Sequence, residues 1–251
     1  MKISIITVCY NSAKTIEKTF QSVKNQTYCD VEYIVVDGNS SDSTLKIINN
    51  YKDVISICIS EEDNGLYDAM NKGIKLATGD IVGILNSDDV FYDHLVLESV
   101  VCFHKENCVE ASVSDVLYTN NAGKIVRNYS AKNWTPEKLK TGFMPPHAGI
   151  FFKKVLFEKF KNYQLNYKIG ADYELITRFF LKHAISWKYL NITSTSMLIG
   201  GLSSSGIGSY KVISKEIKKA LITNNIKFSY LKIQFRVFRK IIGFLNRNVD
   251  K

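Results

Sequence analysis

A pair of adjacent carboxylates follows directly after an apolar run of the chain. Residues 81–85 (IVGIL) are apolar, and Asn86, Ser87, Asp88 and Asp89 come next. Two neighbouring carboxylates repel each other, so a cation is expected close to them. Mg²⁺ prefers oxygen ligands and commonly combines one or two carboxylates with phosphate oxygens. A metal held here would neutralise the charge on a departing diphosphate. A solvated Asp-Asp turn or a helix cap is the alternative interpretation of the same residues.

Asp172 is a candidate general base. The segment 173–182 is predicted to be helical, which places Asp172 at a helix start, where the anionic form is stabilised. An ionised carboxylate there suits removal of a proton from a hydroxyl. N-capping of the helix explains the same residue without catalysis. His147 follows Pro145 and Pro146 at a stiff loop end, where it either binds substrate or packs as a hydrogen-bonded side chain.

Three further polar residues are candidates for nucleotide binding. Asp37 ends the apolar run 31–36, and acids after such strands accept hydrogen bonds from ribose, although an ordinary turn Asp has the same appearance. Asp68 and Asn71 share a face of the helix predicted after Gly65, whose N-terminus favours anions. A capped surface helix is the alternative there. The first strand–helix turn contains neither GxGxxG nor GxxxxGK[ST], which disfavours a dinucleotide or P-loop fold.

The elements that position these residues alternate between strand and helix. The predicted strands are 3–9, 31–36, 54–60 and 81–85, and the predicted helices are 13–25, 44–51 and 68–77. Farther on, 110–118 and 124–129 are predicted to pair as antiparallel strands, and 148–152 is another strand. The alternation predicts an α/β fold with a Rossmann-like, mostly parallel sheet covered by helices on both faces. Ligands bind beyond the carboxyl ends of such strands, where Tyr10, Asp37 and residues 86–89 fall.

The order of these motifs resembles that of a known enzyme family. The motifs are residues 3–11 (ISIITVCYN), 35–44 (VVDGNSSDST), 65–73 (GLYDAMNKG), 78–80 (TGD) and 85–89 (LNSDD). Together they resemble the family 2 glycosyltransferases of the GT-A fold. With 60–73 (SEEDNGLYDAMNKG), 146–152 (PHAGIFF) and 171–174 (ADYE), the chain is similar to bacterial enzymes that build capsular, exopolysaccharide or O-antigen repeat units. The resemblance covers about residues 1–205, the predicted catalytic domain.

The resemblance implies a role for each matched position. Asp88 would hold Mg²⁺ or Mn²⁺ on the donor diphosphate, with Asn86 in place of the usual first Asp, and Asp172 would be the base of an inverting transfer. The donor would be a nucleotide-diphosphate sugar, most simply a UDP-sugar, and the acceptor a glycan or a polyprenyl-diphosphate-linked hydroxyl. Donor contacts are implied for Thr7, Tyr10, Asp37, Asp68, Asn71 and Asp89, and acceptor contacts for His147 and Glu174. Residues 200–203 (GGLS) resemble a loop that closes over the diphosphate.

The basic charge of the chain is confined to its end. Residues 206–251 contain eleven Lys or Arg and two acids, so they carry the whole net charge of +9, and residues 1–205 balance 22 bases against 22 acids. Within 228–245, Phe and Leu residues recur at spacings of three and four, opposite Lys and Arg, which predicts an amphipathic basic helix. Such a tail, 206–251, is expected to attach to an anionic membrane surface. Packing on the catalytic domain, or on a second subunit of a homo-oligomer, is the alternative.

Composition narrows the class and the compartment. With 251 residues and 45% apolar residues, the chain can bury a substantial core. Five scattered cysteines, no signal-peptide pattern and no apolar run of membrane-spanning length predict a cytoplasmic protein, which the basic tail would attach peripherally to the inner leaflet. Two other functions stay open. One is a metal-dependent nucleotidyltransferase acting on sugar phosphates, which usually has a glycine-rich phosphate loop. The other is a non-catalytic polyanion-binding protein, which the neutral first 205 residues and the lack of an RNA motif disfavour, so no nucleic-acid partner is expected.

Overall fold

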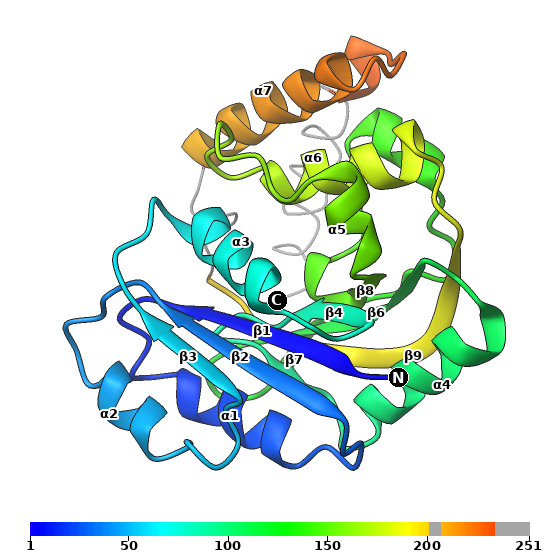
Figure 1. Ribbon diagram of the computed structural model, residues 1–251. Helices are drawn as coiled ribbons and strands as arrows, with labels where there is room; N and C mark the ends of the chain where they lie inside the picture. The colour runs from blue at the N-terminus through cyan, green and yellow to red at the C-terminus, as the bar shows by residue number, and fades with distance from the viewer. Residues whose placement is uncertain (201–206, 234–251) are drawn as a thin grey trace. The chain divides into compact units, whose positions relative to one another are not determined.

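The computed structural model describes residues 1–200 and 207–233 (Figure 1). Contacts divide the chain into two compact units. The first unit comprises Met1–Asn133, Pro145–Leu165 and Ile185–Ile199, and the second comprises Trp134–Met144, Asn166–Ala184 and Gly200–Lys251. The division predicted at residue 205 stays a prediction. Residues 201–203 and the greater part of the amphipathic helix predicted over 228–245 lie outside the described residues.

The first unit contains a nine-stranded sheet. Its strands are β1 (Ile3–Cys9), β2 (Val31–Asp37), β3 (Ile57–Ser60), β4 (Ile81–Ile84), β5 (Val90–Phe91), β6 (Ala111–Thr119), β7 (Ile125–Tyr129), β8 (Ile150–Lys153) and β9 (Trp187–Leu198). The strand order is β3-β2-β1-β4-β8-β6-β9-β5, with β7 on β6. The pairs among β3, β2, β1 and β4 are parallel, and β4 meets β8 in an antiparallel pair. The predicted α/β sheet and its antiparallel hairpin of β6 and β7 are confirmed.

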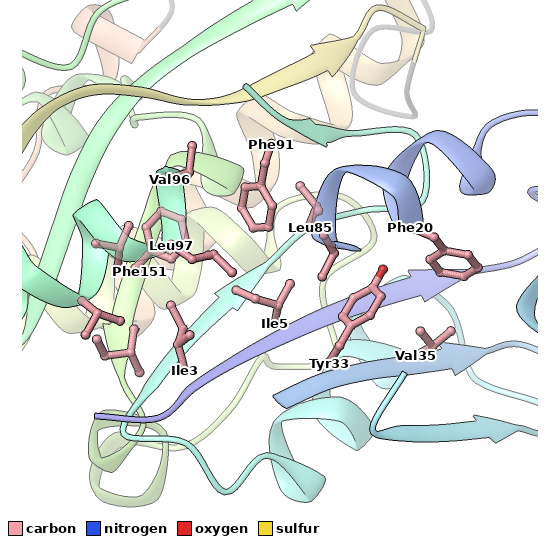
Figure 2. Packing of buried hydrophobic residues seen from close by; sticks show 14 of the residues in the cluster. Ile3, Ile5, Phe20, Tyr33, Val35, Leu85, Phe91, Val96, Leu97 and Phe151 are labelled. Carbon is pink, nitrogen blue, oxygen red and sulfur yellow. The ribbon is translucent and has the colours of Figure 1, made fainter. Parts of the chain in front are cut away.

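Helices cover both faces of this sheet in the first unit (Figure 1). They are α1 (Ile16–Lys24), α2 (Thr44–Asn49), α3 (Leu66–Leu76), α4 (Val96–Asn107) and α5 (Val155–Phe160). Every residue of β1 is buried, as expected for a parallel strand covered on both sides. One face of β1, β2 and β4 packs with α1, α2 and α4 in a core that includes Ile5, Phe20, Leu85 and Leu97 (Figure 2). On the other face, α3 packs on β1 and β2.

One buried carboxylate, that of Glu32, links the amino-terminal ends of the parallel strands through hydrogen bonds. Glu32 accepts hydrogen bonds from Lys2 Nζ at 2.7 Å, Ser4 Oγ at 2.6 Å, Thr78 N at 2.7 Å and Thr78 Oγ1 at 2.6 Å. Burial by itself raises the pKa of Glu32, but these donors outweigh it and lower the pKa to about 2. Thr78 of the TGD motif therefore has a structural role at the amino-terminal ends of the parallel strands.

The described part of the second unit is helical. It contains a 3-10 turn at Pro136–Thr141, helix α6 (Ala171–Thr177), a π-helical turn at Arg178–Lys182 and helix α7 (Ile207–Thr223). Leu139, Leu175 and Phe179 are buried, and so are Ile217 and Leu221 of α7. In the described part of the chain, no helix has the length and apolar character needed to cross a membrane.

Glu32→Gln tests the strand-edge carboxylate. Replacing a buried, fully hydrogen-bonded carboxylate is expected to lower the free energy of unfolding by about 1–3 kcal/mol at neutral pH. Because the folded pKa lies below the unfolded one, the stabilisation is complete above about pH 4.5 and is lost as the pH falls towards 2. Urea denaturation of the variant, the wild type and the exposed control Glu106→Gln measures this. Equal stability of Glu32→Gln and the control at neutral pH would contradict the prediction.

Candidate active site

Three loops meet at the carboxyl ends of β1, β2 and β4. From β1 the chain forms β2 and β3 on one side and then crosses to β4 on the other side of β1, which makes the kind of switch point where open α/β sheets bind ligands. Ser12 Oγ, after β1, lies 2.9 Å from Ser87 Oγ, after β4. Asn11 N donates to Ser40 Oγ at 2.8 Å, which joins the β1 loop to the β2 loop. The sequence-based expectation that Tyr10, Asp37 and residues 86–89 fall at this edge is confirmed.

Asp37 is part of the framework of this edge. Its side chain is completely buried. The carboxylate accepts hydrogen bonds from Ser40 N at 3.0 Å, from Ser40 Oγ and from Ser60 Oγ at 2.7 Å. These bonds fix the start of the β2 loop and the end of β3 in position. Direct contact of Asp37 with a nucleoside stays a prediction.

Thr7 and Tyr10 differ sharply in exposure. Thr7 is fully buried, and its hydroxyl donates to Leu85 O at 2.7 Å and pairs with Tyr33 Oη at 2.9 Å. It thereby fixes the end of β4 directly before residues 86–89. Tyr10, three residues on, exposes 64% of its surface. Of the two, only Tyr10 offers its side chain to a ligand.

Asp63 is a candidate ligand-binding residue that sequence reasoning missed. Its Oδ1 accepts from Gly65 N at 2.7 Å, while Oδ2 lies so close to Gly38 that a Cβ added there would be 2.4 Å away. The same added Cβ would lie 3.5 Å from the ring of Tyr10. Gly38 therefore leaves room for an aromatic ring and a carboxylate oxygen side by side, a combination suited to a nucleobase. The Asp-Asn-Gly motif in the sequence contained the signal.

Residues 86–89 concentrate acceptor oxygens. Burial raises the pKa of Asp88, and burial together with the neighbouring Asp88 raises the pKa of Asp89 well above its usual range. Asp89 is 1% exposed and receives Asn86 Nδ2 at 3.4 Å and a backbone hydrogen bond from Leu198, at the end of β9. Asn86 Oδ1 is buried and has no hydrogen-bond partner among the described residues.

This donor set fits a hard divalent cation. One orphaned amide oxygen and two carboxylates provide oxygen ligands and excess negative charge, which Mg²⁺ and Mn²⁺ both accept. Within the described residues, His, Cys, Asp and Glu side chains form no metal-binding group of three or more. A cation at residues 86–89 would therefore draw further ligands from elsewhere, as Mg²⁺ commonly does from phosphates and water.

Asn71 and Asp68, on α3, already have hydrogen-bond partners within the protein. Asn71 Nδ2 donates to Tyr163 O at 2.9 Å, and Asn71 Oδ1 accepts from Tyr163 N at 2.9 Å. Asp68 Oδ2 accepts from Asn64 N at 2.9 Å and lies 3.9 Å from Lys72 Nζ. Asn71 thus holds the segment after α5, and Asp68 caps the turn before its own helix. The sugar-donor contacts of Asp68 and Asn71 stay predictions.

His147 is held by the same tyrosine. Its Nε2 is hydrogen-bonded to Tyr163 Oη, and Tyr163 in turn stacks on Tyr67 with ring centroids 5.6 Å apart. Burial lowers the pKa of His147 to about 4, so the imidazole is neutral at physiological pH. Its predicted acceptor contact would therefore be that of a neutral hydrogen-bonding group and would carry no charge.

The second unit holds Asp172 and Glu174. Asp172 is the second residue of α6, half-buried, and its Oδ1 accepts from Tyr173 N at 2.7 Å. Glu174 is completely buried. Arg178 Nε and Nη2 donate to it at 3.0 and 2.9 Å, and Asn224 Nδ2 donates at 3.1 Å. Glu174 therefore forms an internal ion pair, and its predicted acceptor contact is untested.

Comparison with known proteins identifies the family. Residues 4–164, more than half of the chain, match the family model described as glycosyl transferase family 2. The chain belongs to glycosyl transferase family 2. It is therefore a glycosyltransferase, and the nucleotidyltransferase and non-catalytic polyanion-binding alternatives are set aside.

Relatives and solved structures agree with this glycosyltransferase assignment. A PGL/p-HBAD biosynthesis glycosyltransferase of Mycobacterium bovis is 30% identical over 226 residues, which cover 87% of this chain and 83% of the relative. The structure of S. aureus TarS 1–349 in complex with UDP-GlcNAc has a TM-score of 0.69 at 19% identity, covering 92% of this chain and 69% of that one. A Pyrobaculum calidifontis mannosyltransferase in complex with GDP-Man and Mn²⁺ has a TM-score of 0.62 at 16% identity, covering 88% and 63%. The GT-A fold is thereby confirmed.

Asp37→Asn separates a framework role from a ligand role in this glycosyltransferase. An amide in place of the carboxylate loses acceptor capacity towards Ser40 and Ser60. A loss of about 1–3 kcal/mol in the free energy of unfolding is expected without any ligand present. Denaturant titration of Asp37→Asn beside Asp30→Asn, whose side chain is 56% exposed, provides the comparison. If Asp37→Asn matched Asp30→Asn in stability and only nucleotide affinity fell, a direct ligand role would be indicated.

Proposed function

We propose that this glycosyltransferase moves a sugar, with inversion, from a nucleotide-diphosphate sugar to a hydroxyl of a glycan or lipid-linked acceptor in the assembly of a bacterial surface polysaccharide. The observation that carries the proposal is the acceptor-rich group at residues 86–89, at the switch point where Ser87 contacts Ser12, in the same loop as the exposed Tyr10. A donor diphosphate needs a cation, and this group is suited to hold one. A UDP-sugar is the first choice of donor, and the UDP-GlcNAc complex of TarS supports it.

The residues of the first unit divide into those that bind and those that position. Asp88 would be the main protein ligand of Mg²⁺ or Mn²⁺, assisted by Asn86 Oδ1, and Asp89 would lie near the donor sugar. Tyr10 and Asp63 hold the nucleobase. Thr7, Asp37, Asp68 and Asn71 act by positioning the loops and α3, because their polar atoms already pair within the protein. When bound, the cation stabilises the negative charge of the departing diphosphate.

Asp172 is the proposed base. Its carboxylate takes the proton of the acceptor hydroxyl, and that oxygen forms a bond to the anomeric carbon of the sugar. The bond from this carbon to the diphosphate oxygen breaks, and its electron pair leaves with the nucleoside diphosphate. Attack from the face opposite the leaving group inverts the configuration. His147 is the proposed acceptor contact, and Glu174 is assigned to the internal ion pair with Arg178.

A donor screen tests the proposal. Purified protein with Mn²⁺ or Mg²⁺ is incubated with UDP-, GDP- and TDP-sugars, and released nucleotide is measured. Asp88→Ala is expected to abolish metal-dependent release. Asp172→Asn is expected to reduce it by about 10²–10⁴-fold while the nucleotide still binds. Asp93→Ala, at an exposed acid a few residues after the site, is the control and should match the wild type.

The outcomes separate the parts of this proposal. Release that survives Asp88→Ala would remove the metal role of that residue, and undiminished release by Asp172→Asn would remove the base. If no donor in the panel releases nucleotide, the binding of UDP, GDP and TDP is measured by calorimetry in the presence of Mn²⁺. Failure to bind any of them would contradict the function as a whole.

Attachment to an anionic membrane surface is the proposed reason for the basic end of the chain. In the described part, Lys211, Lys215 and Lys218 of α7 are exposed, as are Lys227 and Lys232. A cavity of about 480 Å³ in the second unit is lined by Lys227, Lys232 and Phe228, together with Lys140, which forms an ion pair with Glu137 at 2.7 Å. Each Lys near an anionic leaflet contributes about 1 kcal/mol. We therefore place the enzyme, in this proposal, on the cytoplasmic leaflet where a lipid-linked acceptor would be presented.

Co-sedimentation with vesicles tests this attachment. The double variant Lys227→Glu/Lys232→Glu is expected to bind vesicles of phosphatidylglycerol and phosphatidylcholine at least about tenfold more weakly than the wild type. Lys18→Glu/Lys46→Glu changes the net charge equally, at exposed positions of the first unit, and is expected to keep most of the binding. Equal binding by both double variants would show that overall charge, and not this surface, determines attachment.

A further inference from the structure

The carboxylate of Glu216, on α7, is hydrogen-bonded to three consecutive backbone N–H groups of the second unit. Lys168 N donates to Oε1 at 2.6 Å, and Ile169 N and Gly170 N donate to Oε2 at 3.0 and 2.8 Å. Hydrogen bonds to an ionised acceptor are shorter and about twice as strong as neutral ones. Successive backbone N–H groups form a concave anion site, and here a side chain of the protein itself fills it.

This loop leads directly into the proposed base. Gly170 immediately precedes α6, and Asp172 is the second residue of that helix. A Cβ added to Gly170 would lie only 3.2 Å from Glu216 Oε2, so glycine permits the close approach. The three N–H groups would otherwise be satisfied by water, and the loop would have more freedom at the point where it sets the direction of α6.

The same face of α7 holds the segment at two further points. Lys219 Nζ donates to Asn166 O at 2.7 Å and lies 4.2 Å from the ring centroid of Tyr167. Beyond the end of α7, Asn224 Nδ2 reaches the buried Glu174. Residues 216, 219 and 224 therefore contact 166–174 both before and after Asp172. Between them, Ala220 is completely buried.

We propose that Glu216 is a positioning residue for Asp172. By binding the N–H groups of residues 168–170, its carboxylate fixes the start of α6 and hence the direction in which the Asp172 carboxylate points. This inference rests on the proposed function, in which Asp172 is the base. Misplacement of a catalytic group by about 1 Å can cost a factor of about 10² in rate, so loss of the hydrogen bonds between Glu216 and residues 168–170, here called the clamp, should lower the turnover rate.

Hydrogen exchange and kinetics test the clamp together, on the full chain. Glu216→Gln keeps the size of the side chain but removes its charge, and Glu216→Ala removes the acceptor. Both are expected to accelerate amide exchange in a peptide containing residues 168–170 at least about tenfold. Ile222→Ala, at an exposed position of the same helix, is the control and should leave exchange unchanged. Unchanged exchange in Glu216→Ala would overturn the clamp.

Kinetics with the most active donor of the screen then test positioning. Glu216→Gln is expected to lower kcat about tenfold to a hundredfold, with KM and the dissociation constant for UDP within about twofold of the wild type. In an Asp172→Asn background the same substitution should have little further effect, because the residue that Glu216 positions is already disabled. A purely structural role would instead lower the residual rate by the same factor in both backgrounds, and that result would overturn the proposal.

The Asp172→Asn variant separates the two levels of inference. If it retains wild-type turnover, the proposed base is wrong, and a positioning role towards it falls as well. If it is inactive while Glu216→Gln keeps the wild-type kcat, only the role of Glu216 is rejected. A loss of activity in Glu216→Gln that merely follows the unfolded fraction, measured by circular dichroism, also rejects it.

Discussion

Parallel pairing of β1 with both β2 and β4 is the constraint on which the first unit depends. It brings the carboxyl ends of three strands to one edge, so that chain segments far apart in sequence become neighbours there. Parallel strands covered on both faces are mostly apolar, and β1 is buried throughout. The polar side chains within these strands, such as Thr7 and Glu32, are buried and paired inside the protein, so polar groups that can meet a ligand lie mainly in the residues that follow the strands. The loops after β1 and β4 meet through Ser12 and Ser87 because the carboxyl ends of these two paired strands are adjacent.

Acidic residues have two distinct uses in this structure, and their hydrogen-bond donors distinguish them. Glu32, Asp37 and Glu216 are supplied with donors at both carboxylate oxygens, so each stabilises the backbone or strand edge around it. Asp88 and Asp89 are different, because burial disfavours their charge and raises their pKa values. A buried polar group without sufficient partners costs free energy and is retained where function requires it. This contrast supports ligand binding at residues 86–89 and a structural role for Glu32, Asp37 and Glu216.

Sequence reasoning succeeded where one local pattern decides the structure. Apolar runs ending in Asp or Asn gave the parallel strands and the polar edge, although β3 begins at Ile57 and α1 at Ile16, later than predicted. It did not predict α4, or β9, whose sequence WKYLNITSTSML has no clean alternation. The hydrogen-bond partners of Thr7, Asn71 and Glu174 come from distant parts of the sequence, and no spacing in the sequence contains that information. The contact of Glu216 with residues 168–170 could not be predicted for the same reason, because in the sequence Glu216 is only a single acid in a basic segment.

The basic helix α7 illustrates why net charge is a weak guide to the role of a segment. Counted as composition, residues 206–251 form a uniform basic tail. In the structure α7 has one face that is buried at Ile217, Ala220 and Leu221 and that carries Glu216, and another that exposes Lys211, Lys215 and Lys218. Since side chains three and four residues apart share a helix face, the two sets do not compete for space. One face holds the segment of Asp172 while the lysines of the other face are exposed, so a single helix can serve both the proposed base and the proposed attachment.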